Sequence, residues 1–272
     1  MISLGGIFSL PPAESMTLRF PSQFQQLLFA AGASFLLVCG AAAQDIVIDA
    51  QGQARQVKVV GVSSSGQMLE FDVGGGRLGL PLAGPNAVKE VRMNPPAEFG
   101  QAFQAYQAKD YTKARTLMKA VVDKFRGMPA TWAQQASGML VDIDLALKDT
   151  ARAEVNYAAF VKAYPAGGTL QADVLAARIA ASKKNFDLAK QKLGPVTEAA
   201  LKEKSVSGAN ALAFSQAFLV SGQVKEAEGN FNGALEDYLR TVTLFYHDRA
   251  AVGVAQERAD ALRAQHKEAT VP

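Results

Sequence analysis

Side chains that could carry out catalysis are few in this sequence and stand far apart. There are two histidines, His247 and His266, and neither lies at metal-ligand spacing from a cysteine or a carboxylate. Asp142 and Asp144 are two positions apart, which on a helix places their carboxylates on different faces. Cys39 is the sole cysteine, and no Gly-x-Ser-x-Gly motif supplies a serine nucleophile. We therefore expect no enzyme, no metal site and no bound cofactor.

The triplet Gly74-Gly75-Gly76 is the one segment that suggests phosphate binding. No Lys-Ser/Thr follows it and no helix begins there, so a phosphate loop is excluded. Glycine reaches positive φ without steric cost, and we expect a hairpin turn instead. The net charge of +3 is too small to indicate nucleic-acid binding, which usually needs a clustered basic face.

Phe99, Phe103 and Tyr106 form the most informative cluster. They fall at positions i, i+4 and i+7, which is one stripe of a helix. In one interpretation the stripe is an aromatic platform for a partner segment. In the other it packs against the preceding β module or the next helix, as aromatic stripes usually do.

Residues 44–94 alternate apolar and polar side chains, which indicates a β module. The predicted strands are 46–48, 56–61, 68–73, 77–82 and 88–93. Ser63-Ser64-Ser65-Gly66 and the glycine triplet supply turns between them. Five short strands bury little surface as a flat sheet. We therefore expect a small SH3-like β barrel or sheet.

After Asn94-Pro95-Pro96 the sequence becomes alanine-rich with helical spacing, and we expect residues 95–268 to form a second, separately packed unit. One motif recurs there, as Lys109-Asp110-Tyr111-x-x-Ala114, Lys184-Asn185-Phe186-x-x-Ala189 and Gly229-Asn230-Phe231-x-x-Ala234, with a weaker copy, Lys148-Asp149-Thr150-x-x-Ala153. The Lys or Gly ends one helix, and the Asp or Asn caps the next. The aromatic side chain packs back, and the small alanine lets two helices cross closely.

At these residues the chain resembles the tetratricopeptide repeat (TPR) family, over about residues 95–246. The resemblance implies an α-solenoid of antiparallel helix pairs, so that the whole fold is α+β but mainly α. The motif alanines are 39, 36 and 45 residues apart, longer than the family's repeat of about 34 residues. Residues 248–267 read as a last amphipathic helix in a capping role, and 269–272 as a tail.

The resemblance also implies a binding face, because the family binds peptides or proteins in its concave groove. An alignment anchored on Ala114 places Phe99, Phe103 and Tyr106 on the groove side. It places Asp142 and Arg178 at comparable positions in the second and third pairs, where they either clamp a polar peptide or are ordinary surface charges. These five residues are the candidate partner-binding residues.

The N-terminal 43 residues have the pattern of a secretory signal peptide. A short basic start at Met16–Arg19 precedes the apolar run Leu27–Val38, which is too short to span a bilayer comfortably. Ala41–Ala43 supplies small residues for cleavage before Gln44. Cys39 lies in a poor lipoprotein box, because Val38 occupies the place of a small residue. An uncleaved anchor is the other alternative, and either Met1 or Met16 is the true start.

Together these features predict an exported protein, periplasmic or extracellular, that is a non-enzymatic protein-binding scaffold of the cell envelope. The alternative function is a self-associating structural or assembly subunit of an envelope complex. A third hypothesis, an envelope enzyme, has no motif to support it. Its partner is expected to be a protein or peptide, with no nucleic acid and no stable membrane insertion after signal cleavage.

Overall fold

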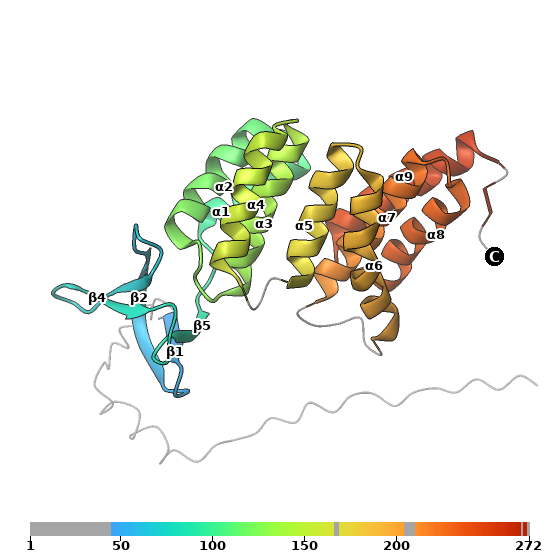
Figure 1. The fold of residues 1–272 in the computed structure, drawn as a ribbon. Coiled ribbons are helices and arrows are strands. Elements are labelled where there is room, and N and C mark those ends of the chain that lie inside the picture. Colours follow the sequence, from blue (N-terminus) through green and yellow to red (C-terminus); the bar gives the residue numbers. More distant parts are fainter. Residues whose placement is uncertain (1–44, 166–168, 204–209, 268, 271–272) are drawn as a thin grey trace, which may run out of the picture. The chain divides into compact units, whose positions relative to one another are not determined.

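The computed structural model describes residues 45–165, 169–203, 210–267 and 269–270. In this part of the chain five β-strands precede nine α-helices, so a small β module is followed by a helical array, as predicted (Figure 1). The expected signal peptide and the last two residues of the tail lie outside the described residues. No described helix is long and apolar enough to cross a membrane.

The β module is a five-stranded antiparallel sheet in the order β4-β3-β2-β1-β5. The strands are β1 Asp45–Asp49, β2 Ala54–Val62, β3 Met68–Asp72, β4 Arg77–Pro81 and β5 Val88–Arg92. Because β4 and β5 end this order, the described strands form a sheet and not a closed barrel. Gly74 adopts a φ of 80° in the β3–β4 turn, and the Val73 N–H donates to the Gly76 carbonyl at 3.2 Å. The predicted glycine hairpin is therefore confirmed.

The helices pack in chain order, and every helix contacts the next (Figure 1). Their bounds are α1 Ala97–Gln107, α2 Tyr111–Phe125, α3 Thr131–Ala146, α4 Thr150–Ala163, α5 Thr169–Ser182, α6 Phe186–Lys202, α7 Ala211–Ala227, α8 Phe231–Leu244 and α9 Arg249–Gln265. In addition α3 contacts α5, α5 contacts α7, and α7 contacts α9. These odd-numbered helices therefore form one layer of a repeat-like array, and the even-numbered helices flank it.

The recurring turn motif works as its residue types predict. Its capping side chains each accept a hydrogen bond at 3.1–3.2 Å from the N–H three residues later, at Asp110, Asp149, Asn185 and Asn230. The residues before them have φ between 60° and 81°, at Lys109, Lys148, Lys184 and Gly229. This left-handed conformation ends one helix before the next begins. The motif alanines, Ala114, Ala153, Ala189 and Ala234, are fully buried, one in each of four hydrophobic clusters.

The β module and the first three helices share one hydrophobic core. This differs from the separate packing of the two units that the sequence predicted. Val47, Leu69 and Val91 of the sheet belong to the same buried cluster as Met118 and Trp132 of α2 and α3. Backbone contacts reinforce the junction. The Val91 N–H donates to the Pro129 carbonyl at 2.8 Å, and the Trp132 indole N–H donates to the Met93 carbonyl at 3.2 Å.

Candidate functional site

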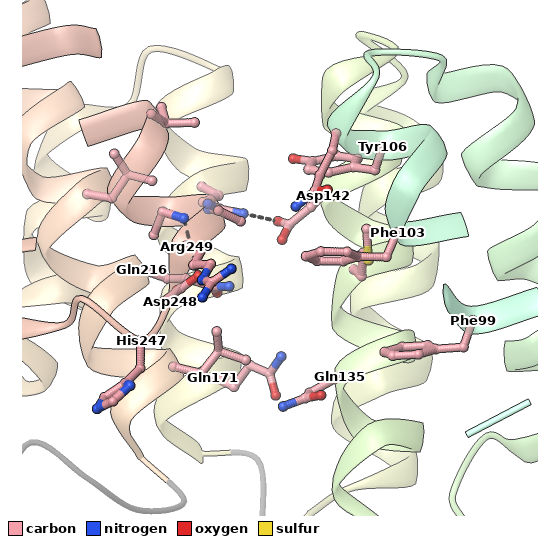
Figure 2. A pocket seen from close by; sticks show the side chains of 18 residues that line it. Phe99, Phe103, Tyr106, Gln135, Asp142, Gln171, Gln216, His247, Asp248 and Arg249 are labelled. Atoms are coloured by element: carbon pink, nitrogen blue, oxygen red, sulfur yellow. Dashed lines mark hydrogen bonds and ion pairs between the residues drawn. The ribbon is translucent and has the colours of Figure 1, made fainter. Parts of the chain in front are cut away.

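The odd-numbered helices line a cleft of about 570 Å³ (Figure 2). One wall comes from α1 and α3, and the other from α5, α7, the turn between α8 and α9, and the start of α9. The two walls differ in chemistry. Figure 2 shows aromatic rings from α1 on one side, facing His247, Asp248 and Arg249 on the other. All five candidate partner-binding residues line this cleft.

Two rings of the aromatic stripe pack against neighbouring helices, and the third is partly exposed. The Phe99 ring lies 6.2 Å from Trp132, centroid to centroid, and the Tyr106 ring lies 5.5 Å from Tyr111. Both side chains are partly buried. Phe103, between them, is 37% exposed. The two flanking rings thus fix the stripe to α3 and α2, while the central ring is open to the cleft.

Asp142 and Arg178 form an ion pair with each other, linking α3 to α5. Their side chains are only 11% and 19% exposed. Burial alone would lower the pKa of Arg178, but Asp142, Tyr106 and Asp248 together raise it above its ordinary value. The guanidinium therefore keeps its positive charge, and the Asp142 carboxylate balances it. The pair is neither a free clamp for a peptide nor two ordinary surface charges, which were the two alternatives from the sequence.

Asp144 points away from the cleft, as the spacing from Asp142 predicts. It is completely buried and pairs with Arg115 Nε at 3.0 Å. It also accepts a hydrogen bond at 2.7 Å from the Asn156 side-chain amide. The two aspartates of α3 therefore hold two different neighbours, α5 and the α2–α4 side.

Tyr106 stands beside the ion pair and is held in its neutral form. Burial, with the negative charge of Asp142 as a second cause, raises its pKa to about 12. Its phenol thus remains a hydrogen-bond donor throughout the physiological pH range.

Sequence reasoning missed the polar lining of the cleft. Gln107, Gln135 and Gln216 come from α1, α3 and α7, and their side-chain amides make no hydrogen bond within the described residues. Glutamine on a helix is ordinarily a solvated surface residue, so single positions carried no signal. Only the stacking of the odd-numbered helices brings these amides together.

The described lining of the cleft consists of apolar, amide and charged side chains with one histidine, His247. Its described residues include no serine, threonine or cysteine that His247 could activate as a nucleophile. Across the described ranges, no group of three or more His, Cys, Asp or Glu side chains is placed to hold a metal ion. Comparisons of the sequence with models of known protein families and with curated proteins found no match.

Proposed function

We propose that this chain is a non-enzymatic, exported scaffold of the TPR type that captures a segment of a partner protein in the cleft. The observation that carries the proposal is Phe103, an aromatic ring that is 37% exposed in a concave site. Aromatic anchors surrounded by polar groups often dominate the binding energy of protein interfaces. The ring stands on a helix that shares its buried cluster with the sheet, so the anchor is positioned before a partner arrives.

The repeated turn supports the TPR assignment. Each copy combines a left-handed residue, a capping side chain and a buried alanine. Under this assignment, the layer of odd-numbered helices that lines the cleft is the groove side. Export and an envelope location rest on the sequence pattern of residues 1–43, and they belong to the same proposal.

The self-association alternative has less support. An apolar outer face on the terminal helix would favour it, yet Ala251, Ala255, Ala259 and Leu262 of α9 are buried against the protein. Val254 is the large apolar side chain of α9 that is well exposed, at 40%, and it lines the cleft itself. An apolar patch for a second copy is thus not formed by the described face of α9.

Envelope extract passed over the immobilised protein tests the function. Phe103→Ala should lower the free energy of unfolding by less than about 1 kcal/mol, because a half-exposed ring leaves a small cavity, and it should abolish partner recovery seen by mass spectrometry. Val155→Ala is the matched control, since Val155 on α4 is 68% exposed and lies outside the cleft. Recovery of the same partners by wild type and Phe103→Ala would contradict the proposal.

A further inference from the structure

We infer that the cleft selects an extended, uncharged peptide segment with large apolar side chains at alternate positions. The inference rests on the proposed function and specifies its ligand. It follows from three properties of the lining: its balance of charge, its unpaired amides, and the spacing of its aromatic rings.

The charges of the cleft balance within the protein. Among its lining residues, Asp142 and Asp248 oppose Arg178 and Arg249, so two negative charges face two positive ones. Asp142 is committed to Arg178. Asp248 caps α9 by accepting from the Ala251 N–H at 3.2 Å. Arg249 is exposed and makes no ion pair among the described residues, and one buried oxygen of Asp248 has no hydrogen-bond partner there, so one charge of each sign is uncommitted. The lining nevertheless has no net charge, so a segment that carries several charges of one sign would lose their hydration without matching counter-charges, which is costly. An uncharged segment avoids that cost.

The unpaired amides favour an extended backbone. Gln107, Gln135 and Gln216 each offer one carbonyl acceptor and two N–H donors, and the described residues leave these groups without partners. An extended segment presents N–H and C=O groups along its length, and these must find partners when buried. A helical segment has already used most of its backbone groups internally. The amides therefore complement an extended chain and would gain little from a helix.

The spacing of the aromatic rings on α1 matches the spacing of side chains along an extended ligand. Phe99 and Phe103 are four residues apart on α1, which corresponds to a rise of about 6 Å along the helix. Alternate side chains of an extended chain lie about 6.6–6.8 Å apart on one face. A segment running along α1 can thus place successive apolar side chains against the two rings. The Met139 side chain of α3, also in the lining, adds an adaptable apolar surface to the same wall.

The test uses four fluorescein-labelled synthetic peptides of equal length with the whole protein. The first alternates Phe or Leu with Ser or Gln; the second and third replace Ser and Gln by Asp or by Lys. The fourth has the composition of the first, with its apolar residues at helical spacing. Fluorescence anisotropy should show the first peptide binding at least about tenfold more tightly than the others, a difference of about 1.4 kcal/mol. Its affinity should change little when salt is raised, because no net charge is neutralised.

Variants locate the binding. Phe103→Ala should weaken the first peptide about tenfold or more, and Gln135→Leu combined with Gln216→Leu should weaken it severalfold. Val155→Ala should leave it unchanged, and urea melts establish that every variant is folded. Tighter binding of a charged or helically spaced peptide that is lost in Phe103→Ala would overturn this inference and leave the proposed function standing. If no peptide binds, or if Phe103→Ala changes nothing, the inference and the proposed peptide-binding cleft both fall.

Discussion

Two charged residues in the lining of the cleft form an ion pair with each other. Asp142 and Arg178 lie on neighbouring helices of the odd-numbered layer and neutralise each other where little solvent reaches. Removing one member of such a pair leaves the other as an uncompensated charge, which costs more than the pair itself contributes. The pair therefore holds α3 against α5, and neither charge is free to pair with a ligand.

Asp142→Asn should lower the free energy of unfolding by about 3 kcal/mol, the low end for a buried pair, because Arg178 keeps some contact with solvent. Asp123→Asn is the control: its partner, Lys119, lies at 2.5 Å but both side chains are more than half exposed, so the loss should be below about 1 kcal/mol. Urea melts measure both. Equal effects of the two substitutions would show that Arg178 finds water when Asp142 is neutral.

The buried phenol of Tyr106 makes the folded protein less stable as the pH becomes alkaline. Its pKa is about 12 in the folded protein and about 10 in an unfolded chain. Because the folded pKa is the higher one, the contribution is fully present below pH 10 and is lost as the pH rises toward 12. Tyr106→Phe should remove this part of the decline, about 2 kcal/mol between those limits. Urea midpoints of wild type and variant, compared at intervals from pH 9 upward, check it; parallel curves would count against a buried neutral phenol.

Small residues lie in the packed faces of the helices. The alanines of the repeated turn are fully buried, and Gly222 lies where α7 approaches α8 closely. A Cβ added at Gly222 would lie 2.5 Å from the ring of Tyr238, which is itself completely buried. Close approach, and not a special backbone angle, is thus the reason for glycine at this helical position.

Gly222→Ala should therefore destabilise the protein by about 1–3 kcal/mol, since the buried ring cannot move aside without loss of packing. Gly253→Ala, in the exposed interior of α9, should instead stabilise it by about 0.5–1 kcal/mol, because a Cβ there meets nothing within 4 Å and alanine favours the helix. Thermal or urea unfolding of both variants decides the matter. Changes of the same sign would mean that helix propensity, and not the crossing, governs position 222.

The sheet completes the hydrophobic core of the first three helices. Val88 and Val91 of β5 are buried in the same cluster as Phe125 and Trp132. The hydrogen bonds from Val91 to Pro129 and from Trp132 to Met93 tie the last strand to the loop and helix that follow α2. The cleft wall formed by α1 and α3 therefore depends indirectly on the β module.

A chain of residues 95–272 should lose about 3 kcal/mol or more of stability relative to one that keeps the sheet, roughly the burial of two apolar side chains. Trp132 is the only tryptophan, so its fluorescence reports on this junction and should shift to longer wavelength. The helical circular dichroism of the more distant helices should persist. Unchanged tryptophan emission and an unchanged urea midpoint would support separately folding modules after all.

The local elements of this protein could be predicted from its residues. Strands, the glycine hairpin, the caps such as Asp110 and the buried alanines such as Ala114 could all be predicted, because each depends on neighbours within a few residues. Turn chemistry and periodicity encode such features directly. The stripe of Phe99, Phe103 and Tyr106 could be recognised for the same reason, although its division into packed and open rings could not.

The composition of the cleft, in contrast, depends on how distant helices pack together. Asp142 and Arg178 are 36 positions apart, and whether they meet depends on how α3 crosses α5. Gln135 and Gln216 come from helices separated by three others, and Val91 reaches Pro129 only after the sheet has docked. Each of these contacts is set by the packing of side chains between elements, which varies with small changes in crossing angle and register. Local sequence patterns do not encode that geometry, so the binding surface emerges only when the odd-numbered helices are stacked.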